Sequence, residues 1–207
     1  MGLWAREVTP RLVNAGSGDP RVLALRSRAV AGLHGRVVEL GFGSGLNVAV
    51  YPAEVDEVVA VEPSEVAWQL SAERREDSPV PVVRGSLDGQ RLDLPDESVD
   101  AVLTTLTLCT IPDPALALAE ARRVLRPGGT LHFLEHGSAP EAGVRRWQRR
   151  IEPLQKVLFD GCHLTRPIAE LVEASGLRTE SLNQEYGPFP TVMRPWGFLF
   201  IGRAVKD

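Results

Sequence analysis

The amino-acid sequence predicts an α/β fold with a mostly parallel sheet, and three observations lead to this prediction. Apolar runs of strand length alternate with segments of helical periodicity from residue 35 onward. A glycine-rich turn directly follows the first apolar run, as in many ligand-binding α/β domains. The last two apolar runs are joined by a loop too short for a crossover, so we expect them to pair antiparallel.

The predicted elements follow one another in a regular order. Strands are expected at 35–41, 56–62, 80–85, 98–108, 129–136, 177–186 and 196–205. Helices are expected at 21–33, near Gly45, and at 64–74, 114–126, 141–158 and 165–175. Three helix starts carry a clear N-cap, twice with a proline behind it: Asp19-Pro20, Ser64 and Asp113-Pro114. Residues 14–20 are turn-forming and predict a loop before the helix at 21–33.

Composition excludes several classes of protein. The formal net charge of −4 argues against a general nucleic-acid binder, which carries a basic surface. The two cysteines, Cys109 and Cys162, are too few for a disulfide framework and suit a reducing cytoplasm. No apolar stretch reaches the roughly 20 residues that cross a bilayer, and the first 20 residues lack the apolar core of a signal peptide. We therefore expect a cytoplasmic protein without an integral membrane segment, in an oligomeric state that the sequence leaves open.

The segment VVELGFGSGLN carries the strongest chemical signal. Gly41, Gly43 and Gly45 form a turn whose backbone can approach a ligand closely, because glycine has no side chain. We expect a helix to begin near Gly45, directly after this turn. A dinucleotide fingerprint would need glycine at position 46, where this chain has leucine. Glu39 would also repel a pyrophosphate but attract a cation. S-adenosylmethionine (SAM), with an ammonium and a sulfonium, fits this charge pattern better than NAD.

An acid at the end of the second strand supports a nucleoside ligand. Glu62 is placed to accept hydrogen bonds from both hydroxyls of a ribose. The alternative interpretation is an ordinary tight turn followed by a surface glutamate. A glycine turn and a strand-end acid at this spacing favour the nucleoside.

At this point the sequence resembles a known family. The segments VVELGFGSGLN, VVAVEPS, LPDESVDAVLTTLTLCTIPDP and RRVLRPGGTLHFLEH are similar to the successive motifs of the class I SAM-dependent methyltransferases. The resemblance covers roughly residues 35–207 and implies a Rossmann-like, seven-stranded sheet of order 3-2-1-4-5-7-6 with strand 7 antiparallel. We find no repeat or long linker, so residues 1–207 are expected to form one domain. By analogy with the fold, residues 1–34 would be a helical lid over a catalytic core at 35–207.

The resemblance also implies a binding role for particular residues. The methionine part of SAM would be lined by Glu39, Gly41, Gly43 and Gly45, and touched by the backbone of Thr105 and Leu106. Glu62 would bind the ribose, Pro63 would lie against the adenine, and Ser86 and Leu87 would cover its edge. Many relatives carry an aspartate where this chain has Ser86, and Asp88 is a candidate substitute for that contact.

A closer resemblance points to the methyl acceptor. The segments LTLCTI, RVLRPGG and especially LFDGCHLTR resemble methyltransferase-like protein 7, the thiol S-methyltransferases. It implies a small-molecule thiol as the acceptor. The alternatives are N-, O- or C-methylation of a phospholipid amine, a quinone or a natural product, and a SAM-binding sensor without catalysis. Animal members carry a hydrophobic N-terminal anchor that this chain lacks, so their membrane location does not carry over.

Candidate catalytic residues lie at predicted strand ends and in the run FDGCHLTR. His136 follows the fifth strand and is a candidate base, although a capping or surface histidine is an equal alternative. Asp160 and His163 lie in a turn between two helices, where they could orient the acceptor or take its proton. Thr165 is the expected N-cap of the second of these helices. Cys162 and His163 are adjacent without a second matching pair and Cys109 is isolated, so we expect no metal site.

The helix at 141–158 carries an apolar stripe that predicts a core-facing side. The stripe consists of Val144, Trp147, Ile151, Leu154 and Leu158. Four arginines lie mostly off it, namely Arg145, Arg146, Arg149 and Arg150. They predict a solvated face or, as the alternative, attraction to an anionic substrate or to a membrane surface.

Overall fold

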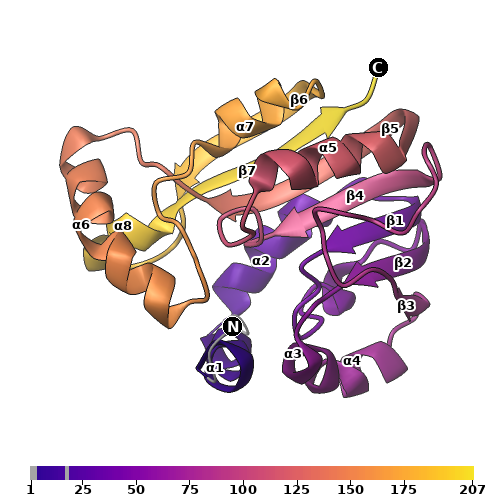
Figure 1. Ribbon diagram of the computed structural model, residues 1–207, viewed down its shortest axis with the longest axis horizontal. Helices are drawn as coiled ribbons and strands as arrows, with labels where there is room; N and C mark the ends of the chain where they lie inside the picture. The colour runs from indigo at the N-terminus through magenta and orange to yellow at the C-terminus, as the bar shows by residue number, and fades with distance from the viewer. Residues whose placement is uncertain (1–3, 17–18) are drawn as a thin grey trace.

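A computed structural model of the protein describes residues 4–16 and 19–207. A seven-stranded sheet forms the centre of the molecule (Figure 1). The strands are β1 (Gly35–Leu40), β2 (Val55–Val61), β3 (Val82–Arg84), β4 (Val99–Thr105), β5 (Leu125–His136), β6 (Arg178–Tyr186) and β7 (Phe198–Val205). Their order is β3-β2-β1-β4-β5-β7-β6. The first five strands pair in parallel, and β7 pairs antiparallel with both β5 and β6. The predicted fold class and strand order are confirmed.

Helices cover both faces of the sheet. They are η1 (Trp4–Val8), α1 (Thr9–Gly16), α2 (Pro20–Val30), η2 (Val48–Val50), α3 (Glu65–Leu70), α4 (Ala72–Glu76), α5 (Pro114–Val124), α6 (Ala142–Leu158), α7 (Ile168–Ala174), η3 (Thr191–Met193) and α8 (Arg194–Gly197). Helices α5 and α7 pack on one face and bury the largest apolar cluster, whereas α2 packs on the other face against β5 and β7. No helix within the described ranges combines the length and apolarity that a membrane crossing requires.

The three predicted N-caps are present. Asp19 accepts a hydrogen bond from the N–H of Arg21, Ser64 from that of Ala67, and Asp113 from those of Ala115 and Leu116. Each contact spans two or three residues, so the cap depends on local sequence alone. Of the loop predicted at 14–20, residues 14–16 belong instead to α1, and residues 17–18 lie outside the described part of the chain.

Several predicted boundaries at the carboxyl edge of the sheet are wrong. Only the three-residue 3-10 helix η2 follows the glycine turn, so no helix dipole begins near Gly45. Strand β4 ends at Thr105 rather than at residue 108, because Leu106 takes a left-handed φ of 55° that breaks the pairing. The helix predicted at 64–74 is divided at Ser71. Helix α7 begins at Ile168, and Thr165 is bonded to Glu152 instead of capping it.

The predicted orientation of α6 is also wrong. Trp147 and Leu154 of its apolar stripe are 56% and 63% exposed, while Gln148 and Gln155 are only 1% and 9% exposed. Gln148 accepts the N–H of Ala139 and donates to the carbonyl oxygens of Gly137 and of Pro195 in α8. Gln155 accepts the indole N–H of Trp196. The hydrogen bonds of these two buried amides hold the side of α6 that carries Gln148 and Gln155 against the rest of the protein. Trp147 and Leu154 are therefore left facing outward, whereas Val144 of the same stripe still packs against the main apolar cluster.

Candidate active site

The glycine turn lies at the carboxyl end of β1 and takes a left-handed backbone at alternate residues. The φ values are 70° at Gly41, 59° at Gly43 and 75° at Gly45, which favour glycine. A Cβ on Gly41 would lie 2.1 Å from Oγ1 of Thr107. Among the described residues, a Cβ on Gly43 would meet only the carbonyl oxygen of Gly41, at 3.9 Å. The turn is therefore closed toward β4 at Gly41 and has room beside Gly43.

Glu39 is buried beneath this turn. Its carboxylate accepts hydrogen bonds from Nδ2 of Asn47, at 2.9 Å, and from the hydroxyl of Tyr51. Burial raises the pKa of Glu39 to about 7, although both hydrogen bonds and the charge of Arg26 oppose the shift. Each carboxylate oxygen of Glu39 thus already accepts one hydrogen bond inside the protein.

An arginine that sequence analysis missed completes this buried network. Nη1 of Arg26, on α2, donates to Oδ1 of Asn47 at 2.8 Å and to Oγ1 of Thr105 at 3.1 Å. Nδ2 of Asn47 also donates to Oγ1 of Thr105, at 3.0 Å. The network joins α2, the glycine turn and the end of β4. The available signal was that Arg26 lies next to Leu25 on the apolar side of its helix.

Glu62 follows β2 and lies on the other side of the turn. Its two oxygens accept the backbone N–H groups of Gly43 and Ser64, each at 2.7 Å. Burial raises the pKa of Glu62 against these two hydrogen bonds, and the charge of Asp160 raises it further.

The remaining residues assigned to the adenine lie around the ends of β2 and β3. Pro63 and Leu87 are exposed and offer apolar surface. Oγ of Ser86 accepts the N–H of Asp93 at 2.6 Å, and Asp88 accepts the N–H of Gln90 at 2.9 Å. Both polar side chains are thus already used by their own loop.

The loop after β4 is organised by a buried acid that sequence analysis also missed. Glu135 accepts hydrogen bonds from Oγ1 of Thr104 at 2.8 Å, from the N–H of Thr107 at 2.9 Å and from that of Cys109 at 3.2 Å. Burial raises its pKa against these bonds. Leu106 lies within this loop with its strained backbone. An acid inside the apolar run GTLHFLEH was the available signal.

His136, the last residue of β5, meets both cysteines. Its Nε2 lies 3.0 Å from Sγ of Cys162, and Cys109 lies close to both side chains. A hydrogen bond with Cys109 and burial raise the pKa of Cys162 well above its usual range. The expectation that Cys109 is isolated is wrong, because the loop after β4 and the turn after α6 converge. The expectation of no metal site rested on that isolation, so it loses its support.

Asp160 and His163 lie on the same turn as Cys162. Asp160 and Gly161 both have left-handed φ values, of 48° and 87°, so the predicted turn is present. Nδ1 of His163 lies 3.4 Å from Oε1 of Glu152, and burial lowers its pKa. The N–H of His163 donates to the carbonyl oxygen of Cys109 at 2.7 Å, which holds the turn against the loop after β4.

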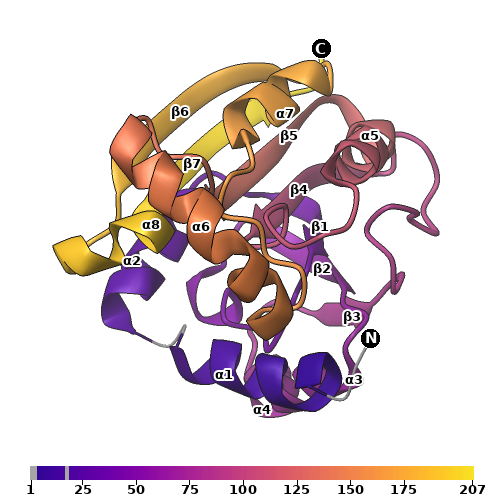
Figure 2. The ribbon, with the colours of Figure 1, turned by 60° about the vertical axis from the view of Figure 1, so that its left-hand side comes forward.

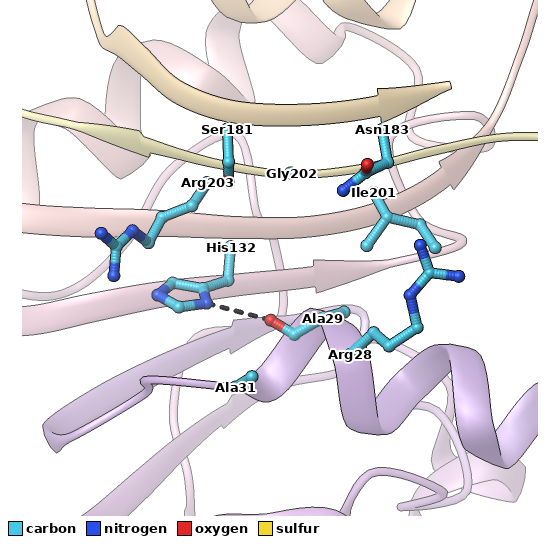
Figure 3. Close-up of a pocket in the computed structure, with 9 residues that line it drawn as sticks. All are labelled: Arg28, Ala29, Ala31, His132, Ser181, Asn183, Ile201, Gly202 and Arg203. Carbon is cyan, nitrogen blue, oxygen red and sulfur yellow. Dashed lines mark hydrogen bonds between the residues drawn. The ribbon is translucent and has the colours of Figure 1, made fainter. Parts of the chain in front are cut away.

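A separate pocket of about 340 Å³ opens between α2 and the strands β5, β6 and β7 (Figure 3). Arg28 and His132 are among its lining residues. Arg28 pairs with Glu185, and Nδ1 of His132 bonds to the carbonyl oxygen of Ala29 at 2.9 Å. Burial lowers the pKa of His132 to about 4. Its arginine and its histidine are thus already bonded within the protein, so this pocket is a weaker candidate than the carboxyl edge.

Comparisons with known proteins show which family the chain resembles. A family profile described as a methyltransferase domain matches residues 38–133. Human thiol S-methyltransferase TMT1B is 33% identical over 96% of this chain and 83% of its own length. The thiol S-methyltransferase TMT1B of Rattus norvegicus is 35% identical over 82% of this chain and 70% of its own length. A SAM-dependent methyltransferase from Thermotoga maritima, described as a possible histamine N-methyltransferase, has a similar fold. Its TM-score is 0.68 at 23% identity, over 98% of this chain and 100% of its own.

Proposed function

We propose that this chain, which belongs to the class I SAM-dependent methyltransferases and among them to the thiol S-methyltransferase family, methylates a small-molecule thiol. The observation that carries the proposal is the identity to human TMT1B over nearly the whole chain. SAM-dependent methyl transfer is the activity of the family. The acceptor atom and the roles of the individual residues are the proposal.

The residues at the carboxyl edge suit a nucleoside with a cationic centre. Bound SAM supplies a methyl carbon activated by its sulfonium, and the protein contributes binding and orientation. We assign the ribose hydroxyls to Glu62 and the adenine faces to exposed Pro63 and Leu87, with Ser86 at its edge. The methionine part is assigned to Gly41, Gly43 and Gly45 with the backbone of Thr105 and Leu106. Buried Glu39 contributes negative charge beneath it when it is ionised, and a bound ammonium or sulfonium favours that ionised form.

A thiol acceptor makes modest demands on this site. Free thiols titrate near about 8.5, so a fraction is thiolate at neutral pH without a strong protein base. Asp160 and His163, on the turn that faces the edge, are assigned to orienting the acceptor. His136 is engaged with Cys162 rather than free, so we assign it a role through that contact.

A panel of acceptors with isotope-labelled SAM tests the proposal. The panel contains an alkyl thiol, phosphatidylethanolamine and a phenol or quinol, and the labelled product identifies the methylated atom. We expect turnover with the thiol. Methylation of only the amine or only the phenol would show that the acceptor atom is nitrogen or oxygen rather than sulfur. SAM binding without turnover on any acceptor would favour a sensor.

The N-terminal helices support a lid over this edge. Nε1 of Trp4 and Oγ1 of Thr9 both donate to the carbonyl oxygen of Leu158, at 3.0 and 3.2 Å. Helix α1 also packs against α3, so it spans from the β2 side of the site to the end of α6 (Figure 2). We propose that this segment limits access of water and acceptor to the cofactor.

The outer face of α6 supports peripheral contact with an anionic membrane. Trp147, Leu154 and Val157 are exposed on it, and Arg150 lies 5.5 Å from the ring centre of Trp147. Exposed apolar side chains flanked by arginines suit a helix that lies in the headgroup region. We further place the enzyme in the cytoplasm, since its two free thiols suit a reducing compartment.

A further inference from the structure

Three soft metal ligands converge at the carboxyl edge of the sheet. Cys109 comes from the loop after β4, His136 from the end of β5 and Cys162 from the turn after α6. The two Sγ atoms and one imidazole nitrogen all lie within 4.8 Å of one another. Both cysteines are buried free thiols. Nothing in the proposed transfer of the methyl group requires two cysteines and a histidine at one point.

We propose that Cys109, His136 and Cys162 bind a Zn²⁺ ion through two thiolates and one imidazole nitrogen. Zn–S bonds of about 2.3 Å and Zn–N bonds of about 2.0–2.1 Å, at tetrahedral angles, separate ligand atoms by roughly 3.6–3.8 Å. The three atoms already lie within 4.8 Å, and Nε2 of His136 is 3.0 Å from Sγ of Cys162. Binding therefore needs side-chain shifts of at most about 1 Å, with no change of the fold.

Hydrogen bonds hold the ligand-bearing loops in place without the metal. Glu135 accepts the N–H of Cys109, and Nη1 of Arg166 donates to the carbonyl oxygens of Leu108 and Ile111 on either side of it. Nε2 of Gln155 lies 3.5 Å from Sγ of Cys162. Nδ1 of His136 is shielded from solvent and meets no acceptor within the described part of the protein. A bound water is the group we expect to accept its hydrogen.

The ligand types select the metal. Two thiolates and one imidazole suit Zn²⁺, whereas Mg²⁺ and Ca²⁺ require oxygen ligands. Three protein ligands also leave one tetrahedral position open, as in catalytic rather than structural zinc sites. Cu⁺ also binds soft donors, so the two metals are compared directly in the test below.

The open position suits the acceptor of the proposed reaction, and this step rests on the thiol function proposed above. An acceptor thiol that coordinates zinc releases its proton to solvent and binds as a thiolate. A lone pair on its sulfur forms the bond to the methyl carbon as the bond from that carbon to the sulfonium sulfur breaks. The electron pair of the broken bond stays on the sulfur of S-adenosylhomocysteine, and the neutral thioether leaves the metal.

Metal binding is measured on the full chain, independently of turnover. We expect about one zinc per chain by elemental analysis, and thiolate-to-metal charge-transfer absorption when Co²⁺ replaces it. Cys109→Ser, Cys162→Ser and His136→Ala should each weaken zinc binding by about 100-fold or more, because even outer-sphere changes cost 10- to 100-fold. His34→Ala, at an exposed histidine, is the matched control and should leave binding unchanged. In the wild type, zinc should protect both cysteines from alkylation, which tests the site without any variant.

Each other outcome overturns a defined part of the proposal. Zinc affinity that is insensitive to all three variants, copper in place of zinc in the elemental analysis of the purified protein, or a Cys109–Cys162 disulfide would overturn the zinc site. Bound zinc together with no thiol turnover would overturn the thiol function and leave the site standing. Thiol turnover that survives removal of zinc, with a rate that still rises toward about pH 8.5 as for a free thiol, would overturn only the role of the metal in the reaction.

Discussion

The carboxylate of Glu62 accepts a hydrogen bond from the backbone N–H of Gly43, with 2.7 Å between the two atoms. The contact ties the end of β2 to the glycine turn after β1. The same side chain also accepts the N–H of Ser64. Hydrogen bonds to a charged acceptor contribute about 1.5–3 kcal/mol each. Glu62 thus shapes the turn, in addition to the ribose contact that we propose for it.

Replacement of Glu62 should weaken SAM binding. We expect Glu62→Gln to raise the Kd for SAM by about 10- to 100-fold in calorimetric titration. This loss of affinity corresponds to the free energy of one hydrogen bond to a charged group. Glu65→Gln is the control, since Glu65 pairs with Arg84 at the surface. An unchanged Kd would remove Glu62 from the ribose site, and tighter binding of NAD than of SAM would refute the cofactor.

The buried acid Glu39 should make stability depend on pH. Its pKa is raised from 4.5 to about 7 in the folded protein. The fold therefore favours the protonated carboxyl, a contribution that is complete below about pH 4.5 and lost as the pH rises through about 7. The shift corresponds to about 3 kcal/mol.

Glu39→Gln should remove this dependence. Relative to the wild type, the free energy of unfolding of the variant should rise by about 3 kcal/mol between pH 4.5 and pH 8. Urea denaturation at the two pH values measures this difference. A difference between variant and wild type that is the same at both pH values would show that Glu39 is already ionised in the folded state at low pH.

Substitutions at two glycines should distinguish the cost of a left-handed backbone from the cost of a steric clash. Gly41 and Gly128 have similar φ values of 70° and 79°, but only at Gly41 would a Cβ collide, with Thr107. Gly128→Ala should cost about 1–2 kcal/mol for the left-handed backbone alone. Gly41→Ala should cost more and also reduce SAM binding, as urea denaturation and calorimetry would show. Equal costs at the two positions would mean that Thr107 moves away freely.

The turn after α6 should affect the acceptor rather than the cofactor. Asp160→Asn keeps a residue that tolerates the left-handed backbone, and His163→Ala removes the neighbouring imidazole. We expect each to lower kcat/KM for the thiol by about 10-fold through misplacement of the acceptor, with the Kd for SAM within a factor of two. Glu170→Gln, on exposed α7 surface, is the control. A rise in the Kd for SAM with unchanged kcat would assign the turn to the cofactor instead.

The exposed face of α6 should bind anionic vesicles. Trp147→Ala and Leu154→Ala should each weaken sedimentation with phosphatidylserine-containing vesicles, since each buried apolar side chain contributes about 1.5–3 kcal/mol. Leu116→Ala, equally exposed on α5, should have no effect. Both α6 variants should unfold within about 0.5 kcal/mol of the wild type, as exposed positions do. Vesicle binding that is equal in all variants would exclude α6 as the contact.

Sequence reasoning succeeded where structure depends on neighbours along the chain. The cap at Asp113 requires only N–H groups two and three residues away, and the glycine turn requires only its own φ values. It failed for part of α6, because an apolar stripe predicts burial, whereas Gln148 bonds to the backbone of Gly137 after β5 and of Pro195 in α8. The meeting of Cys109 with Cys162 likewise depends on how two loops converge, and no local pattern encodes it.

Helix α6 docks through two buried amides and through Val144, and it leaves Trp147, Leu154 and Val157 exposed. Gln148 and Gln155 occupy the positions that would be costly to change, since each is buried and bonded on both sides of its amide. The outward positions carry no such constraint. Substitutions there, in evolution or by design, can therefore change the charge and polarity of that face while the buried contacts that hold α6 stay intact.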